Sequence, residues 1–365
     1  MNFFHTHVSP RARQLVDEVL ASGRLSEGPL VQQFENELAS RLGLPNPVAL
    51  NSGTSALHLA LVLAGVGPED EVILLAQTFV ATGLAVLMQR AVPVFADIDP
   101  HTGNLCPQSV AKRFTRSTKA VIPVHWGGLP CDLAQLNEVA ARQDAVVIED
   151  AAHALGATYR GQPIGSISRF TCFSFQAIKH LTTGDGGALC CTSEVDARRA
   201  KTQRWFGIDR QHSRPSLLGE RIYDIDSLGF KYHMNDLSAA LGLGNLDDFA
   251  ARLARRREIA GRYREALADV PGLELLANAP DREHAYWLFT LLVDRREDLI
   301  RHLADAGIPS SVVHQRIDHN RIFGGIRPDL PGQVEFDRRQ LAIPLHEALA
   351  YTDVSLIIDE VRRAS

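Results

Sequence analysis

The chain has 365 residues, of which 45% are hydrophobic, and it carries a formal net charge of −5 at pH 7. This length and apolar fraction suit a large α/β domain followed by a smaller one, each with a packed core. The acidic balance offers no basic field for nucleic acid, and no apolar run approaches the length of a membrane span. We therefore expect a globular, cytoplasmic protein with neither nucleic acid nor membrane as a partner.

Neither the start of the chain nor its cysteines indicate export or a metal site. Residues 1–7 lack the basic segment and apolar core of a signal peptide. The five cysteines show no Cys-x-x-Cys spacing, and the adjacent Cys190 and Cys191 are typical of reduced thiols in a core. His346-Glu347 begins like the helix of a zinc protease, but position 350 is alanine, so we expect no metal.

The first motif in chain order follows a short predicted strand that ends at Leu50. Gly53, Thr54 and Ser55 stand where a predicted helix begins, and that helix runs to Gly65. The free amide groups and the positive dipole end of such a helix start can cradle a phosphate. An ordinary N-cap is the other interpretation of the same residues.

Apolar strand-like runs alternate with helical patterns, at residues 71–75, 92–96, 120–124 and 145–148. This alternation predicts an α/β protein with a large, mostly parallel sheet that helices cover on both faces. We expect a large domain over residues 1–246 and a smaller C-terminal α+β domain over residues 247–365. A long helix at 247–268 opens the second domain, and a strand at 285–293 and a helix at 296–306 follow.

Two residues within the large domain indicate a particular chemistry. Lys179 closes an apolar and aromatic run and precedes a glycine-rich turn, which suits a partly desolvated amine that acts as a nucleophile. Asp150 ends a predicted buried strand, where parallel sheets present their functional side chains, although a surface aspartate is the plainer interpretation. Pyridoxal 5'-phosphate (PLP) uses both groups, because its aldehyde bonds to a lysine and its ring nitrogen is held protonated by an acid.

Together these segments resemble the sugar aminotransferases of the DegT/DnrJ/EryC1/StrS family, which have the aspartate aminotransferase fold, fold type I of the PLP enzymes. The resemblance extends over nearly the whole chain, and the order and spacing of its pieces make it specific. The matching pieces are residues 26–29, 34–35, 51–57, 67–73, 77–82, 93–100, 123–125, 149–157, 174–187 and 229–237.

The resemblance implies a role for each matching side chain. Lys179 is the catalytic residue, which bonds to the cofactor and afterwards moves a proton as a base. Asp150 pairs with the ring nitrogen of the cofactor, His153 lies near its phenolic oxygen, and Phe79 lies against its face. The full set of implied cofactor-binding residues is Gly53, Thr54, Ser55, Phe79, Asp150, His153, Ser174, Lys179, Lys231 and His233.

The resemblance also implies a homodimer with shared active sites. The segment at residues 229–234 matches one that crosses to the phosphate of the neighbouring subunit. Many family members carry asparagine and arginine where Lys231 and His233 stand here, and a basic residue is suited to the same contact.

The implied reaction moves an amino group from L-glutamate, which becomes 2-oxoglutarate, to a keto group of a nucleotide-linked deoxysugar, with a 4-keto-6-deoxyhexose favoured over a 3-keto sugar. Loop side chains read sugar hydroxyls, so we expect substrate contacts from His314, His319 and Asn320. A metal site at the two histidines is less favoured, because neither cysteine nor carboxylate has suitable spacing.

Other functions remain open at this point, namely a lyase, desulfurase or sugar dehydratase that uses PLP, or a noncatalytic PLP-binding regulator. The dehydratase variant has histidine in place of the lysine, whereas this chain retains Lys179. No cysteine stands in an obvious mobile loop, which a desulfurase needs. A regulator predicts loss of Lys179 or Asp150, or a fused DNA-binding module, and neither is seen.

Overall fold

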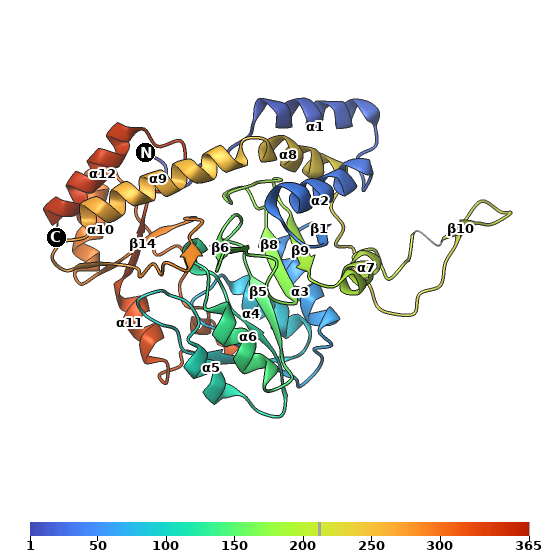
Figure 1. The fold of residues 1–365 in the computed structure, drawn as a ribbon, viewed down its shortest axis with the longest axis horizontal. Coiled ribbons are helices and arrows are strands. Elements are labelled where there is room, and N and C mark those ends of the chain that lie inside the picture. The colour runs from blue at the N-terminus through green and yellow to red at the C-terminus, as the bar shows by residue number, and fades with distance from the viewer. Residues whose placement is uncertain (211–212, 365) are drawn as a thin grey trace.

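A seven-stranded sheet forms the centre of the molecule, in a computed structural model that describes residues 1–210 and 213–364 (Figure 1). Strand β9 runs antiparallel to both of its neighbours, and the other neighbouring pairs are parallel, so the predicted, mostly parallel sheet is confirmed. From one edge to the other the strands are β1 (Pro47–Leu50), β9 (Gly187–Cys191), β8 (Phe170–Ser174), β5 (Val146–Asp150), β4 (Thr118–Ile122), β2 (Glu71–Leu75) and β3 (Val92–Ala96).

Side chains alternate between the two faces of this sheet, as the pleat requires. In β2, Ile73 and Leu75 join one core cluster, and Val72 and Leu74 join the other. Residues of α2 (Pro29–Leu42), α5 (Pro107–Arg113), α6 (Leu133–Ala141) and α8 (Asp236–Leu246) complete the first cluster, and α1 (Pro10–Ser22) packs on α8. The second cluster is completed by α3 (Gly53–Leu63), α4 (Val80–Met88) and α7 (Glu194–Gln203).

The C-terminal part has a smaller sheet with a third core cluster. Its strands are β12 (Leu273–Leu275), β14 (Phe289–Val293) and β15 (Gln340–Ile343), and its helices are α9 (Phe249–Leu267), α10 (Arg296–Asp305), α11 (Pro331–Arg339) and α12 (Tyr351–Ala364). Phe249 and Leu253 at the start of α9 pack into the core of the large sheet. The two parts therefore share apolar surface, and the boundary between residues 246 and 247 stays a prediction.

Short elements connect these layers. They are the 3-10 turns η1 (Trp126–Gly128), η2 (Ile317–His319) and η3 (Arg321–Phe323), and the strands β6 (Thr158–Tyr159), β7 (Gln162–Pro163) and β13 (Arg282–Glu283). No helix among the described residues is long and apolar enough to span a bilayer.

The strand expected at 285–293 was wrong in its first half, because β14 begins only at Phe289. Tyr286 has a φ of 52°, a left-handed conformation that interrupts a strand. Residues 285–287 instead bond to η1, where the backbone N–H groups of Ala285 and Trp287 donate to the carbonyls of Gly128 and Gly127. This segment therefore runs beside the large sheet rather than within the small one.

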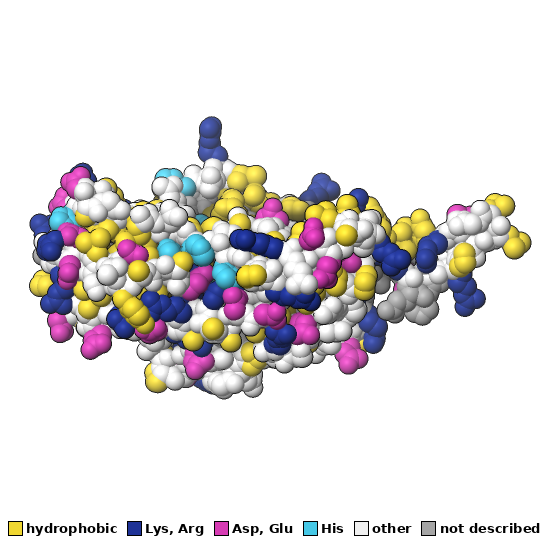
Figure 2. Space-filling model, turned by 90° about the horizontal axis from the view of Figure 1, so that it is seen from above, with side chains coloured by type: hydrophobic (Ala, Val, Ile, Leu, Met, Phe, Trp, Pro, Cys, Tyr) yellow, Lys and Arg dark blue, Asp and Glu magenta, His cyan; other side chains and the backbone are white. Residues whose placement is uncertain are grey.

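A hairpin projects from the body of the molecule between α7 and α8 (Figure 1). It contains β10 (Arg214–Pro215) and β11 (Arg221–Ile222), and its tip carries the exposed side chains of Leu217 and Leu218. Hydrophobic side chains at the end of this projection are evident in Figure 2. A monomer therefore presents apolar surface on an extended arm, which we name the hairpin arm.

Candidate active site

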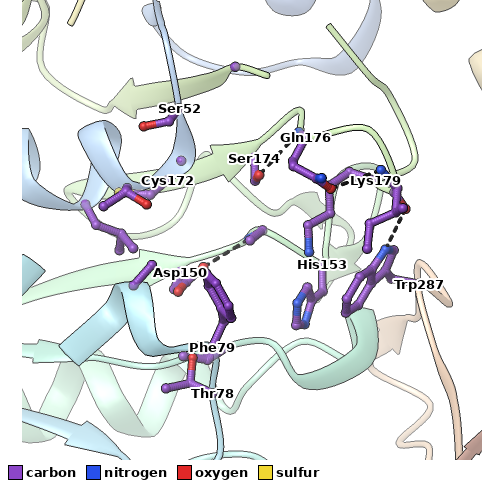
Figure 3. Close-up of a pocket in the computed structure, with 18 of the residues that line it drawn as sticks. Ser52, Thr78, Phe79, Asp150, His153, Cys172, Ser174, Gln176, Lys179 and Trp287 are labelled. Atoms are coloured by element: carbon purple, nitrogen blue, oxygen red, sulfur yellow. Dashed lines mark hydrogen bonds between the residues drawn. The ribbon is translucent and has the colours of Figure 1, made fainter. Parts of the chain in front are cut away.

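A cavity of about 350 Å³ opens where β5 and β8 end and α3 begins (Figure 3). This is the carboxyl edge of the parallel strands, where open α/β sheets bind their ligands. The structure brings together eight of the residues singled out from the sequence, all of which line this cavity: Gly53, Thr54, Phe79, Asp150, His153, Ser174, Lys179 and His314.

Lys179 directs its amine into the cavity from the loop after β8. Burial lowers the pKa of this amine to about 7, and the nearby charge of Asp150 opposes that shift only partly. The Nζ atom lies 3.5 Å from the ring centroid of Trp287. An amine with this pKa is present in both protonation states near neutrality, which suits a group that takes up and returns a proton.

Asp150 ends β5 with a buried carboxylate held by two hydrogen bonds. Its Oδ2 accepts from the hydroxyl of Thr82 at 2.7 Å, and its Oδ1 accepts from the backbone N–H of Ala152 at 3.2 Å. Burial raises the pKa of Asp150, and these two hydrogen bonds act against that rise. A cation at the end of the carboxylate would stabilise its charged form further.

The start of α3 forms a compact cradle beside Ser174. Ser52 caps the helix, because its hydroxyl accepts from the backbone N–H of Ser55 at 3.0 Å. Gly187 of β9 permits this approach, since a Cβ there would lie 2.5 Å from the carbonyl oxygen of Ser52. Free N–H groups, the helix dipole and the hydroxyls of Thr54 and Ser174 suit a phosphate.

Two histidines and a tryptophan form the opposite wall of the cavity. The ring of His153 stacks on Trp287 with centroids 3.9 Å apart, and it lies 5.7 Å from the ring of His314. Burial, with the charge of Lys179, lowers the pKa of His153 well below its usual value and that of His314 to about 4. Both imidazoles are therefore neutral at pH 7, each with one donor and one acceptor nitrogen.

Each of these imidazoles keeps one buried nitrogen without a hydrogen-bond partner in the described part of the chain, Nδ1 of His153 and Nε2 of His314. The loop that carries His314 is strained, because Val313, a β-branched residue, has a φ of 57°. The amides of Gln77 and Gln340 hold it by donating to the carbonyl of His314 at 2.9 and 3.2 Å. The fold thus fixes an unpaired imidazole at the cavity.

Five other residues singled out from the sequence do not line the cavity of this chain: Ser55, Lys231, His233, His319 and Asn320. The hydroxyl of Ser55 donates to Asn51 Oδ1 at 2.6 Å and so remains within the helix start. His319 and Asn320 are exposed beyond the loop of His314.

Lys231 and His233 lie beside the cradle rather than in it. Their backbone forms bridges with Trp205 and Leu50, and the His233 ring packs 4.2 Å from that of Trp205.

Trp287 and Thr82 were not assigned roles from the sequence. Thr82 belongs to the segment 77–82, which matches the family, and it stands four residues after Thr78. The hydroxyl groups of these two residues lie 2.8 Å apart, and their spacing in the sequence was the signal that could have indicated a role for Thr82. Trp287 gives no local signal, because its position beside Lys179 arises only from the packing of residues 285–287 against η1.

The residues present fit pyridoxal phosphate. A buried carboxylate suits a protonated ring nitrogen, an unpaired histidine nitrogen suits a ring oxygen, and a helix start suits a phosphate. The amine of Lys179 suits the aldehyde. The described residues include no group of three or more histidine, cysteine, aspartate or glutamate side chains able to hold a metal ion.

Fold and site together define a PLP-dependent enzyme of fold type I. The model of the DegT/DnrJ/EryC1/StrS aminotransferase family matches residues 7–362, and the chain belongs to this family. The chain is 41% identical over 361 residues to the spore coat polysaccharide biosynthesis protein SpsC of Bacillus subtilis (strain 168), an alignment that covers 96% of this chain and 93% of SpsC.

Solved structures agree with this assignment. The sugar aminotransferase CalS13 from Micromonospora echinospora superposes with a TM-score of 0.95 at 36% identity, with 100% of both chains covered. The putative sugar aminotransferase Spr1654 from Streptococcus pneumoniae, solved in its PLP form, superposes with a TM-score of 0.92 at 30% identity, covering 100% of this chain and 98% of that chain. The fold expected from the sequence is thus confirmed.

Proposed function

We propose that this protein uses PLP to move an amino group from L-glutamate to the keto group of a nucleotide-linked deoxysugar, with a 4-keto-6-deoxyhexose as the favoured acceptor. The observation that carries the proposal is the pairing of a buried amine at Lys179 with a buried carboxylate at Asp150 in one cavity. The similarity of the chain to the sugar aminotransferase CalS13 and to the polysaccharide biosynthesis protein SpsC supports a sugar acceptor. A cytoplasmic location remains the expectation from the sequence.

The cofactor is PLP, which when bound supplies an electron sink for negative charge at the carbon that carries the amino group. Lys179 is the base that would take the proton from that carbon and return it on the other side of the intervening nitrogen, at the carbon of the former aldehyde. Asp150 would face the ring nitrogen and stabilise its positive charge, and Thr82 keeps this carboxylate charged and oriented. Gly53, Thr54 and Ser174 would hold the phosphate.

The two histidines that line the cavity, His153 and His314, can form hydrogen bonds with hydroxyl groups of a substrate. His314 presents a neutral imidazole with an unpaired, buried Nε2, and an unpaired buried group gains most from a ligand that completes its hydrogen bond. Phe79, which is 55% exposed at this cavity, offers an apolar face for a ring. His319 and Asn320 are the further substrate contacts that we propose on the same loop.

A homodimer with shared sites completes the proposal. Support comes from the hairpin arm, whose tip exposes Leu217 and Leu218, since an apolar arm of this kind is suited to packing on a second copy of the chain. Lys231 and His233 follow the hairpin arm in the chain and do not line the cavity of their own subunit. We therefore assign them to the cofactor phosphate in the active site of the partner subunit.

Two separate half-reactions test the function. L-Glutamate alone should change the absorbance of the bound cofactor, and a nucleotide-linked keto sugar should restore it with a kcat/KM about a hundredfold or more above that of simple 2-oxo acids. A panel of UDP-, dTDP- and GDP-linked sugars compares 3-keto with 4-keto acceptors. Restoration by 2-oxo acids at comparable efficiency would reject the sugar acceptor and leave the PLP chemistry intact. A lyase, desulfurase or dehydratase would instead release product without this cycle, and a regulator would show neither half-reaction.

Mixing two inactive variants tests the shared site. In a one-to-one mixture of Lys179→Ala with a Lys231→Ala/His233→Ala double variant, half of the dimers are mixed and one of their two sites is intact, so about one quarter of the sites should work. A fully active double variant, or an active monomer, contradicts the shared site.

A further inference from the structure

Trp287 contacts the lysine loop through both its ring and its nitrogen. The ring faces the Lys179 amine, with Nζ 3.5 Å from its centroid. The indole Nε1–H donates to the backbone carbonyl of Ile178, the residue directly before the lysine, at 2.9 Å (Figure 3). Trp287 is 1% exposed, so both contacts lie out of water.

The same segment holds the lysine from its other side in the sequence. His180, directly after the lysine, donates from Nε2 to the carbonyl of Ala285 at 2.8 Å. Gly128 allows residues 285–287 to pack this closely, because its φ is 102° and a Cβ there would lie 3.0 Å from the backbone nitrogen of Tyr286. Residues 285–287 thus form hydrogen bonds with both sequence neighbours of Lys179, Ile178 and His180.

The N-terminal arm, residues 1–9, closes against this indole. Phe4 stacks on Trp287 with ring centroids 5.3 Å apart and an interplanar angle of 20°. The arm is held in place by His346, which donates to the carbonyl of Asn2 at 3.2 Å, and by His5, which lies 3.3 Å from a carboxylate oxygen of Glu347. Phe3 packs edge-on against Phe4, and in the described part of the chain its ring does not stack on the tryptophan.

We propose that Trp287 is a positioning residue for Lys179, and that the N-terminal arm forms an outer wall of the active site through Phe4. The inference rests on the proposed role of Lys179 as a base. A lysine that leaves the cofactor needs a second position, and the indole face supplies one, because a desolvated ammonium is attracted to the ring. The hydrogen bond from Trp287 Nε1–H to Ile178 holds the backbone of the loop in place while the Lys179 side chain moves between these two positions.

The charge of Lys179 depends on several groups around it. Asp150 at the end of β5 favours the ammonium, and the imidazoles of His153, His180 and His314 adjoin it in their neutral forms. Among the described tryptophans, Trp287 alone places its ring against the Nζ atom of Lys179, and this contact also favours the ammonium form.

Labelling of the cofactor-free protein with ethyl acetimidate tests the contact between the Trp287 ring and the Lys179 amine. The reagent modifies only neutral amines, and peptide mass spectrometry reports Lys179 separately at each pH. The parent midpoint should lie at a pH of about 7. Trp287→Met, which loses the ring, should lower the midpoint by about half a pH unit or more, whereas Trp287→Phe should stay within about 0.2 unit. An unchanged midpoint, or one that rises toward ordinary lysine, would show that the indole only excludes water.

The phenylalanine variant isolates the second contact and remains informative if the methionine variant does not fold. Because it loses the bond to Ile178, its kcat should fall about fivefold with an unchanged labelling midpoint and KM. A kcat equal to that of the parent would overturn the anchoring role of Nε1–H.

Phe4→Leu tests the wall, and Phe3→Leu is its matched control. At pH 9, where the amine is neutral, Phe4→Leu should label Lys179 about threefold faster or more because the stack no longer blocks access, and Phe3→Leu should match the parent. Equal rates for both would overturn the wall. Labelling involves no sugar, so a protein that labels as expected but aminates no sugar would fail the proposed function alone.

Discussion

The two sides of the active-site cavity differ in how complete they are. On the sheet side, formed by Ser52, Thr82, Asp150 and Ser174, the carboxylate of Asp150 and the cap of α3 already have hydrogen-bond partners. On the loop side, formed by His153, Trp287 and His314, two buried imidazole nitrogens have none among the described residues. The sheet side is preorganised for a permanent cofactor, whereas the loop side keeps two hydrogen bonds for bound groups to complete. Nδ1 of His153 suits the ring oxygen of the cofactor, and Nε2 of His314 is left for a transient ligand.

Removing the lysine should have the largest effect. Lys179→Ala should reduce turnover by about 10⁴-fold, because the proton transfer loses its base. Absorbance should show bound cofactor without a covalent link, and borohydride reduction should leave no pyridoxyl mass on the protein. Lys119→Ala, an exposed position, is the control. Retained turnover in the Lys179 variant would contradict the central assignment.

Asp150→Asn tests the sheet side with little change of shape. The amide cannot stabilise a positive ring nitrogen, so both half-reactions should slow by about a hundredfold. Stopped-flow absorbance measures each half separately, and the exposed Asp305→Asn is the control. If only the half-reaction with the nucleotide sugar slowed, Asp150 would contact the substrate rather than the cofactor. The distinction between the sheet side and the loop side would then be wrong.

Thr82→Val should lower kcat by about tenfold, since a hydrogen bond to a charged group is lost. Thr82 acts against the rise that burial causes in the pKa of Asp150, so its loss raises that pKa further. Because the charged carboxylate is the active form, the acidic limb of the rate profile should move to higher pH. A profile that is lower at every pH without this displacement would mean that Thr82 has a packing role only.

His314→Gln should produce the smallest effect, confined to the loop side. Loss of one well-placed hydrogen bond should raise KM for the nucleotide sugar about fivefold and leave the glutamate half-reaction unchanged. Gln315→Ala, an exposed neighbour, is the matched control. An equal effect on both half-reactions would assign His314 to the cofactor instead.

The sequence predicts site residues that stand in local motifs and misses those that only tertiary packing brings to the cavity. Lys179 and Asp150 stand in local motifs at strand ends, and strand position follows from apolar runs, so the sequence predicts both residues, although it gave no role to Thr82, which bonds to Asp150. Trp287 carries no such signal, because its contact with Lys179 depends on how residues 285–287 pack on η1. The hydroxyl of Ser55 was assigned to the phosphate because it stands at a helix start, yet it bonds to Asn51.

The two hydrogen bonds that grip the lysine loop join residues 105 and 109 positions apart in the chain. Both bonds tie the loop to residues 285–287, which are synthesised after every strand of the large sheet. The large sheet can therefore assemble during synthesis while its lysine still lacks its final surroundings. Uptake of the cofactor should accordingly lag behind recovery of helical circular dichroism during refolding, and the appearance of its absorbance marks the moment at which the C-terminal part has docked.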